Sequence, residues 1–284
     1  IGSEEQKKTY IPKICSGEYP AGGFGLTETT AGSDPAGMRC SAVLDGDQWV
    51  LNGNKIFITS AEYAGVFVVW AVTDKAAKKG KGISTFLVEN GTKGFTVGRA
   101  EHKMGQHASA TNELIFEDCR IPKTAIMGKP NDGFRTAVGE LAGGRIGIGS
   151  LGLGVGQAAI EYAARYAKER RQFEQSIAEF QAIQWMIVES YTELEAARLL
   201  LMNAAYQKEK GRFFARQASM AKYFATEAAE RACHNAIQIL GGYGYTKEFP
   251  VERYARDVRI CSIYEGTNQI QRVIIARDIL SSLG

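Results

Sequence analysis

The chain contains 284 residues, of which 45% are hydrophobic and 23% are charged, so it can bury a sizeable core, and its length favours two domains over one. The formal net charge of +3 is close to neutral and argues against a nucleic-acid-binding protein, which carries a basic stripe. The five cysteines are scattered without a C-x-x-C pair, which indicates reduced thiols, and the three histidines lack metal-ligand spacing, which argues against a metal site.

Residues 20–130 are the first predicted folded region, a β-domain. Short runs rich in β-branched and aromatic residues, such as VFVVWAVT and ISTFLVE, follow one another with turn residues between them. Two dipeptides, Asp45-Gly46 and Asn52-Gly53, are typical of β-hairpin turns. No helix-length periodic segment separates the runs, so we predict an antiparallel β-sandwich or barrel rather than β-α-β units.

Residues 131–284 are the second predicted region, an up-and-down four-helix bundle. From about residue 133 the apolar residues recur at helical spacing, as Ile183, Ile187, Tyr191 and Leu194 do. We expect four long amphipathic helices, at about 134–167, 177–211, 213–244 and 266–281. The predicted fold class is therefore α+β with more than one domain.

The stretch GIGSLG, residues 147–152, matches the dinucleotide-binding pattern G-x-G-x-x-G letter for letter. That pattern requires a strand before it and a β-α-β unit around it, whereas this stretch lies in the middle of a predicted helix. We interpret its small residues as a site of close helix packing and reject nicotinamide binding.

The stretch CSIYEGTNQIQ, residues 261–271, places one acid, Glu265, just before an apolar helix. Burial raises the pKa of a carboxylate toward the working pH and makes it a better general base, and Gly266 would let a substrate approach closely. A second interpretation is an acid that complements the dipole of the helix N-terminus. The stretch alone does not decide between the two.

Six segments, in this order and spacing, resemble the acyl-CoA dehydrogenase family over nearly the whole chain, with the nearest likeness to its short- and medium-chain members. They are FGLTETTAGSD (24–34), NGNKIFITS (52–60), ERRQF (169–173), FQAIQ (180–184), QILGGYGY (238–245) and IYEGTNQIQR (263–272). The resemblance implies FAD as the cofactor and α,β-dehydrogenation of a fatty acyl-CoA thioester to the trans-2-enoyl-CoA. It also implies a β-domain followed by a helical bundle.

The resemblance assigns roles residue by residue. Glu265 is the base that takes the α-proton, its backbone N–H helps to bind the thioester oxygen, and the β-hydrogen leaves as hydride to flavin N5. The implied cofactor-binding residues are Thr27, Ser33, Ile58, Thr59, Arg170, Phe173, Gln181, Gln238, Gly241, Gly242, Thr267 and Gln269. The implied substrate-binding residues are Ser33, Arg145, Tyr264 and Gly266. Some family members place the base at a position that matches Gly144, where Glu140 is the only acid nearby.

The resemblance also implies a homotetramer, an electron-transferring flavoprotein as electron acceptor, a role in fatty acid β-oxidation, and a location in the bacterial cytoplasm or the mitochondrial matrix. Residues 1–19 match the end of the family's N-terminal helical domain, which we expect to be largely absent from this chain. Two alternatives are an acyl-CoA oxidase of the same fold, which uses oxygen directly, and a non-catalytic scaffold that kept the fold.

Overall fold

The computed structural model describes residues 1–283, which divide into two compact units. The first unit contains residues 1–103 and 107–139, and the second contains Met104–Gln106 and the residues from Glu140 onward. The first unit holds α1 (Glu4–Ser16), β1 (Ala21–Gly25), β2 (Ser41–Asp45), β3 (Gln48–Thr59), β4 (Ala64–Val72), β5 (Ile83–Glu89), β6 (Phe95–Ala100), β7 (Thr111–Pro122) and β8 (Ile126–Met127). Helix α2 (Gly133–Glu169) begins in the first unit and continues into the second.

The second unit is helical, and the predicted order of a β-domain followed by a helical domain is therefore confirmed. After α2 it holds the short strands β9 (Arg171–Gln172) and β10 (Gln175–Ser176), then α3 (Gln181–Glu209), α4 (Ala215–Leu240), α5 (Val251–Val258) and α6 (Asn268–Leu283). Within residues 1–283, no helix combines the length and the apolar character that a membrane crossing requires.

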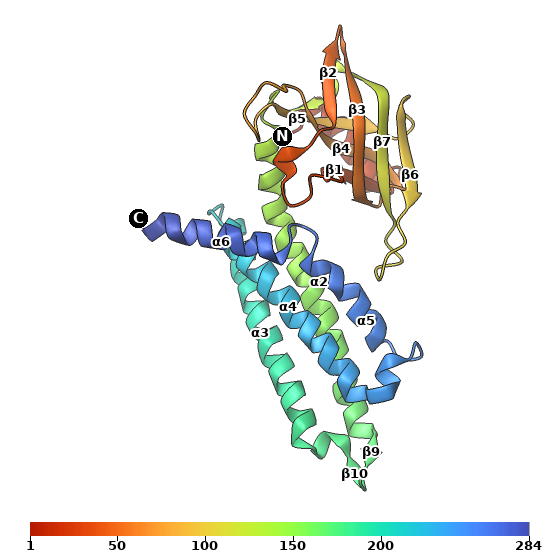
Figure 1. Ribbon diagram of the computed structural model, residues 1–284, viewed down its shortest axis with the longest axis vertical. Coiled ribbons are helices and arrows are strands. Elements are labelled where there is room, and N and C mark those ends of the chain that lie inside the picture. Colours follow the sequence, from red (N-terminus) through yellow and green to blue (C-terminus); the bar gives the residue numbers. More distant parts are fainter. Residues whose placement is uncertain (284) are drawn as a thin grey trace. The chain divides into compact units, whose positions relative to one another are not determined.

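The strands of the first unit form one eight-stranded sheet in the order β6-β7-β3-β2-β4-β5-β8, with β1 also paired to β4 (Figure 1). The predicted Asp-Gly hairpin is present, because Asp45 pairs with Gln48 across a two-residue turn in which Gly46 has a φ of 62°. Most neighbours are antiparallel, as expected, but β1 and β2 each pair with β4 in parallel. The local pattern could not indicate this, because side chains alternate between faces in either strand direction.

The second predicted turn, Asn52-Gly53, was wrong. Both residues lie inside β3, where the pairing with β7 shifts register between Leu51 and Gly53. Glycine is required there for two reasons: its φ is 134°, and a Cβ would lie 2.8 Å from the Cα of Cys40. The dipeptide therefore produces a β-bulge and a close approach to Cys40, the residue before β2, instead of a turn.

The four predicted long helices are present as α2, α3, α4 and α6, each within a few residues of the expected range except where α4 gives way to a 3-10 turn, Gly241–Tyr245. In Figure 1, α2, α3 and α4 run side by side, while α6 lies across their end. The short helix α5, which the sequence pattern did not predict, packs along α4. The second unit is thus a bundle whose fourth long helix crosses the other three.

Close packing between α2 and α4 depends on small residues from both helices. The buried face of α4 carries seven fully buried alanines: Ala218, Ala221, Ala225, Ala228, Ala229, Ala232 and Ala236. On α2, a Cβ added to Gly156 would lie 2.8 Å from the Cα of Ala229 on α4. One added to Gly149 would lie 2.7 Å from Leu201 Cδ2 on α3 and 3.3 Å from the Cα of Lys222 on α4. The interpretation of GIGSLG as a packing site inside a helix is therefore confirmed.

Candidate active site

The segment that carries Glu265 makes an unusual turn between α5 and α6. Glu265 has a φ of 55° and Gly266 a φ of 84°, so two successive residues adopt the left-handed conformation. That conformation costs a non-glycine residue on the order of 1–2 kcal/mol and persists only where surrounding contacts hold it. Here the Gln271 side chain donates to the carbonyl oxygens of Gly266 at 2.8 Å and of Glu265 at 3.2 Å.

The Glu265 carboxylate lies against α2 at Gly144, where the absence of a side chain leaves room for it. A Cβ added to Gly144 would lie 2.9 Å from the carboxyl carbon and from both oxygens. Oxygen Oε2 is buried and has no hydrogen-bond partner within residues 1–283. Burial raises the pKa of Glu265, and the positive charges of Arg145 and Lys222 oppose that rise. The group therefore holds a proton more readily than an ordinary glutamate does.

Arg145, the next residue on α2, is almost fully buried, with 4% of its surface exposed. Its Nη1 donates a long hydrogen bond to Ser219 Oγ at 3.4 Å, and its Nε is buried without a partner in the described chain. Burial lowers the pKa of Arg145, and the neighbouring Glu265 charge opposes that change. A buried guanidinium with unused donors is suited to binding an oxygen atom of a ligand.

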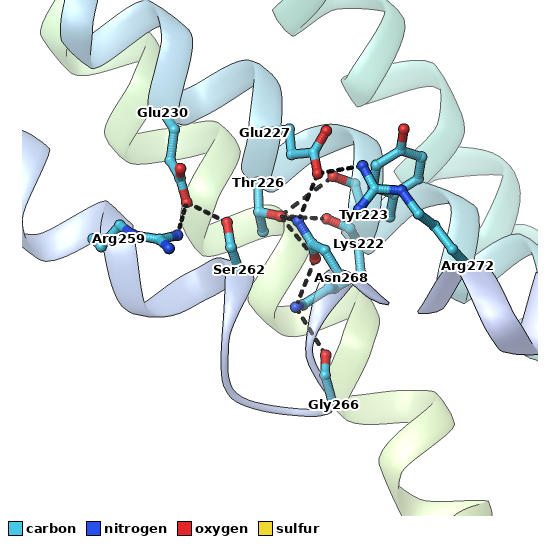
Figure 2. Close-up of polar contacts among 10 residues, drawn as sticks. All are labelled: Lys222, Tyr223, Thr226, Glu227, Glu230, Arg259, Ser262, Gly266, Asn268 and Arg272. Carbon is cyan, nitrogen blue, oxygen red and sulfur yellow. Dashed lines mark hydrogen bonds and ion pairs between the residues drawn. The ribbon is translucent and has the colours of Figure 1, made fainter. Parts of the chain in front are cut away.

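Lys222, on α4, is a residue of this site that the sequence did not predict. It is fully buried, and its ammonium donates to the Gly266 carbonyl oxygen at 3.0 Å and to Asn268 Oδ1 at 2.9 Å (Figure 2). A signal was available: Lys222 lies four residues after Ala218 and three before Ala225, on the buried face of the helix.

Three other predicted residues lie on or beside this turn. Tyr264 is half-buried, and burial raises the pKa of its hydroxyl, which lies 3.9 Å from the Cys261 sulfur. Thr267 caps α6 by accepting the Ile270 N–H at 3.2 Å. Gln269 is exposed, and together with Thr267 it lines a polar groove whose other residues are Glu227, Glu230, Arg231, Arg259, Ser262, Ile263 and Asn268.

Six predicted cofactor residues gather elsewhere, where α2 ends, α3 begins and α4 ends: Arg170, Phe173, Gln181, Gln238, Gly241 and Gly242. All six are exposed, and Phe173 presents 87% of its surface. The Arg170 guanidinium lies 5.7 Å from the centre of the Tyr243 ring. Gln238 is about 24 Å from Lys222 along α4, at about 1.5 Å per residue. The structure therefore does not bring these residues to Glu265 within one chain.

The remaining predicted residues belong to the first unit. Thr27 and β3 are adjacent, since the Ile56 N–H donates to the Thr27 carbonyl oxygen at 2.9 Å. At the end of β3 the Thr59 side chain is exposed, whereas Ile58 is buried in the core of the sheet. Ser33 is exposed on the loop that follows β1.

That loop is held by a buried ion pair which the sequence did not predict. Lys55 Nζ lies 2.8 Å from Glu28 Oε1, and 0% of the lysine side chain and 7% of the glutamate side chain are exposed. The Glu28 carboxylate also accepts the backbone N–H groups of Arg39 at 2.6 Å and Cys40 at 2.9 Å. The pair therefore fixes both ends of the segment that carries Ser33.

Comparison with known families gives two matches that together cover most of the chain. Residues 23–119 match the middle domain of acyl-CoA dehydrogenase, and residues 131–280 match its C-terminal domain.

Individual relatives agree with these matches. The chain is 45% identical over 278 residues to the short-chain specific acyl-CoA dehydrogenase of Clostridium acetobutylicum, an alignment that covers 98% of this chain and 73% of the relative. It is 47% identical over 282 residues to the human mitochondrial short-chain specific acyl-CoA dehydrogenase, covering 99% and 68%. It is also 45% identical over 279 residues to the caffeyl-CoA reductase-Etf complex subunit CarC of Acetobacterium woodii, covering 98% and 73%.

Solved structures are similar over the same range. Butyryl-CoA dehydrogenase from Megasphaera elsdenii aligns with a TM-score of 0.95 at 41% identity, covering 98% of this chain and 72% of that chain. The structure of PigA with FAD and proline aligns with a TM-score of 0.95 at 31% identity, with the same coverage.

Proposed function

The chain belongs to the acyl-CoA dehydrogenase family and is an oxidoreductase of that family, and we propose that it converts a short fatty acyl-CoA thioester to its trans-2-enoyl-CoA with FAD as cofactor. The observation that carries this proposal is the half-buried Glu265 carboxylate, whose buried Oε2 has no partner in the described chain and whose pKa is raised by desolvation. A short-chain substrate is supported by the C. acetobutylicum and human relatives, whose names specify it.

In this proposal Glu265 removes the α-proton of the thioester. The proton passes to the carboxylate, and the electron pair of the broken C–H bond moves toward the thioester carbonyl as an enolate develops. No hydrogen bond from the Glu265 backbone N–H is found within residues 1–283, so this donor is available to the thioester oxygen. A donor directed at a developing negative charge stabilises the transition state more than the ground state.

The residues also fit FAD when the Arg170 cluster and the groove beside Glu265 come from different subunits, since the family resemblance implies a cofactor site partly across a subunit interface. Arg170 is exposed and has the forked donor geometry that suits a diphosphate. Gly242 offers open space, because a Cβ placed there would meet no atom of residues 1–283 within 4 Å. The polar groove that includes Thr267 and Gln269 could take other polar groups of the cofactor. FAD, when bound, supplies the acceptor for the β-hydrogen and its two electrons.

We extend the proposal to the assembly and the electron partner. Helix α3 exposes six large apolar side chains, Trp185, Val188, Tyr191, Leu199, Met202 and Tyr206, each at least 44% exposed. Most lie three or four residues apart, which is the stripe expected of a helix that packs against another subunit. It supports the homotetramer that the family resemblance implies. The relative from A. woodii, named as part of an Etf complex, supports an electron-transferring flavoprotein as the partner. The setting in fatty acid β-oxidation is proposed from the family resemblance.

The test begins with the absorption spectrum of the purified protein, followed by anaerobic addition of acyl-CoA thioesters from butyryl-CoA to palmitoyl-CoA. We expect a flavin spectrum that bleaches with butyryl-CoA, with one enoyl-CoA formed for each flavin reduced. Fast reoxidation by oxygen with release of hydrogen peroxide would favour the oxidase instead. A flavin that no acyl-CoA bleaches would contradict the proposal and favour the scaffold.

A further inference from the structure

We propose that Lys222 is a positioning residue of this site, which holds the Glu265–Gly266 turn in place and supplies a buried positive charge to the Glu265 carboxylate. The inference rests on the proposed function, in which Glu265 is the base. Lys222 touches neither of the reacting carbons in that proposal, and it acts through Glu265.

The contacts of Lys222 explain how the turn keeps its conformation. Its ammonium reaches from α4 to the Gly266 carbonyl oxygen at 3.0 Å, and Gln271 reaches the same oxygen from α6 at 2.8 Å. One carbonyl group is therefore held by side chains from two helices. Because Glu265 is a non-glycine residue in the left-handed conformation, the turn relaxes unless such contacts hold it.

A second contact links Lys222 to the start of α6. Lys222 Nζ donates to Asn268 Oδ1 at 2.9 Å, and the other end of that amide, Nδ2, donates to Thr226 Oγ1 at 3.0 Å (Figure 2). Lys222 and Thr226 lie one turn apart on α4, so α4 holds both ends of the Asn268 side chain. The α4 side chains thus hold the turn at Gly266 and again at Asn268, two residues later.

The charge of Lys222 is not neutralised by direct contact. Its hydrogen-bond acceptors within residues 1–283 are a backbone carbonyl and an amide, and neither is ionised. The charged or titratable groups around it are Cys261, Arg145, Glu265 and Glu230, and Glu265 is likewise influenced by Arg145. Burial lowers the pKa of Lys222 to about 8, so it still carries its charge at neutral pH.

Removal of this charge has a predictable sign. The ammonium favours the ionised form of Glu265, so its loss raises the pKa of that carboxylate further. Since the base acts when ionised, the acid limb of the pH profile moves to higher pH. A lysine that merely filled space in the bundle would change stability without moving this limb.

The experiment compares Lys222→Gln and Lys222→Met in the flavin-loaded enzyme, with Thr226→Val as the matched control. Thr226→Val removes a hydrogen bond to Asn268 and changes no charge. The readouts are kcat, KM, the pH profile of kcat/KM, the melting temperature, and an infrared titration of the Glu265 carboxyl band, which is assigned by its loss in Glu265→Gln.

For both Lys222 variants we expect a loss in kcat of roughly 10- to 100-fold with little change in KM, because the base is misplaced whereas most of the substrate contacts remain. The acid limb and the infrared titration both move to higher pH. Lys222→Gln has a higher kcat than Lys222→Met, since its amide can donate to the Gly266 carbonyl oxygen. The acid limb of its kcat/KM profile still lies at higher pH than in wild type. Thr226→Val lowers the melting temperature and leaves the limb in place.

The inference is overturned if folded, flavin-loaded Lys222→Gln has the acid limb and carboxyl titration of wild type. If Lys222→Met does not fold, the Gln variant carries the test, because it keeps a donor at the same place. Failure of the proposed function has a different signature: Glu265→Gln would keep wild-type turnover. In that event the infrared titration still reports whether Lys222 acts on the Glu265 carboxylate.

Discussion

Each unit of the molecule contains a carboxylate close to a buried lysine, buried in Glu28 and half-buried with one buried oxygen in Glu265, and the two differ in their hydrogen bonds. Glu28 in the first unit accepts three hydrogen bonds, two from backbone N–H groups and one from Lys55. Glu265 in the second unit has an oxygen with no partner in the described chain. A carboxylate with both oxygens hydrogen-bonded stabilises a loop, whereas one with an oxygen left without a partner remains able to take up a proton.

The two lysines differ in the same way. Lys55 contacts its carboxylate directly at 2.8 Å, so its charge is neutralised. Lys222 donates to neutral oxygens instead, and its charge acts on Glu265 without a hydrogen bond between them. We infer that the Glu28–Lys55 pair stabilises the fold. Glu265 and Lys222 stabilise it less, because their charges are not paired directly, and this leaves Glu265 able to act as a base.

The largest effect that we expect is the loss of activity in Glu265→Gln. We expect dehydrogenation to fall by about 10²–10⁴-fold or more, because the group that breaks the C–H bond is removed while FAD is still bound. Single-turnover bleaching by butyryl-CoA measures the step directly. Turnover within about tenfold of wild type would remove Glu265 from the role of base.

The same variant tests the stability side of the comparison. The pKa of Glu265 is raised in the folded protein, so the stability linked to it is present below the unfolded pKa and is lost as pH rises through the folded value. Gln resembles the protonated carboxyl and avoids that loss. The variant is therefore expected to melt at the same or a higher temperature than wild type at neutral pH, as thermal unfolding would show.

The next largest effect that we expect is a loss of stability in Lys55→Met. This change leaves the buried Glu28 charge without its counterion, which costs about 3–5 kcal/mol in comparable cases. Chemical unfolding measures the loss, and the double variant with Glu28→Gln is the control, since it removes the uncompensated charge and should recover part of the stability. A loss below about 1 kcal/mol would mean that the ion pair does not hold the loop.

The comparison also explains what the sequence could and could not predict of the fold. The β-rich runs and the helical spacing are local patterns, so the two halves and the four long helices were predictable. The parallel pairing of β1 with β4 and the bulge at Gly53 depend on which strands become neighbours, and no local pattern contains that information. Gly53 shows the difficulty, because an Asn-Gly pair serves a turn or a bulge equally well.

For the candidate site, the sequence indicated the residues that belong to recognisable motifs and missed those that support them. Glu265 was singled out by its motif. Lys222 lies outside all six segments, and Glu28 and Lys55 lie inside two of them but were given no role, because an isolated lysine is far more often exposed than buried. Their burial follows from the packing of distant segments, as between Lys55 and Glu28, which are 27 residues apart.

A smaller effect is expected from Gly144→Ala. The new Cβ would lie 2.9 Å from the Glu265 carboxyl group, which is too close, so the carboxyl group must move. It can do so because it is the end of a flexible side chain. Alanine is favoured over glycine in a helix by about 1 kcal/mol, so the fold should be as stable as wild type or more stable. We expect the chemical step to slow roughly tenfold. Unchanged bleaching kinetics would show that the carboxylate position observed here is not the one used in the reaction.

The smallest effect is predicted for Glu140→Gln, one helical turn before Gly144 on α2. Glu140 is exposed, and the family's alternative base position is occupied here by a glycine, which has no group to accept a proton. The Glu265 carboxylate lies directly against Gly144. Glu140, one helical turn earlier on α2, is therefore expected to take no part in the chemistry. We expect kcat and the acid limb of the pH profile to stay within about twofold of wild type, measured beside Glu265→Gln in the same preparation. A loss as large as that of Glu265→Gln would reverse the assignment and place the base on α2, and the unpaired state of Glu265 would then need another explanation.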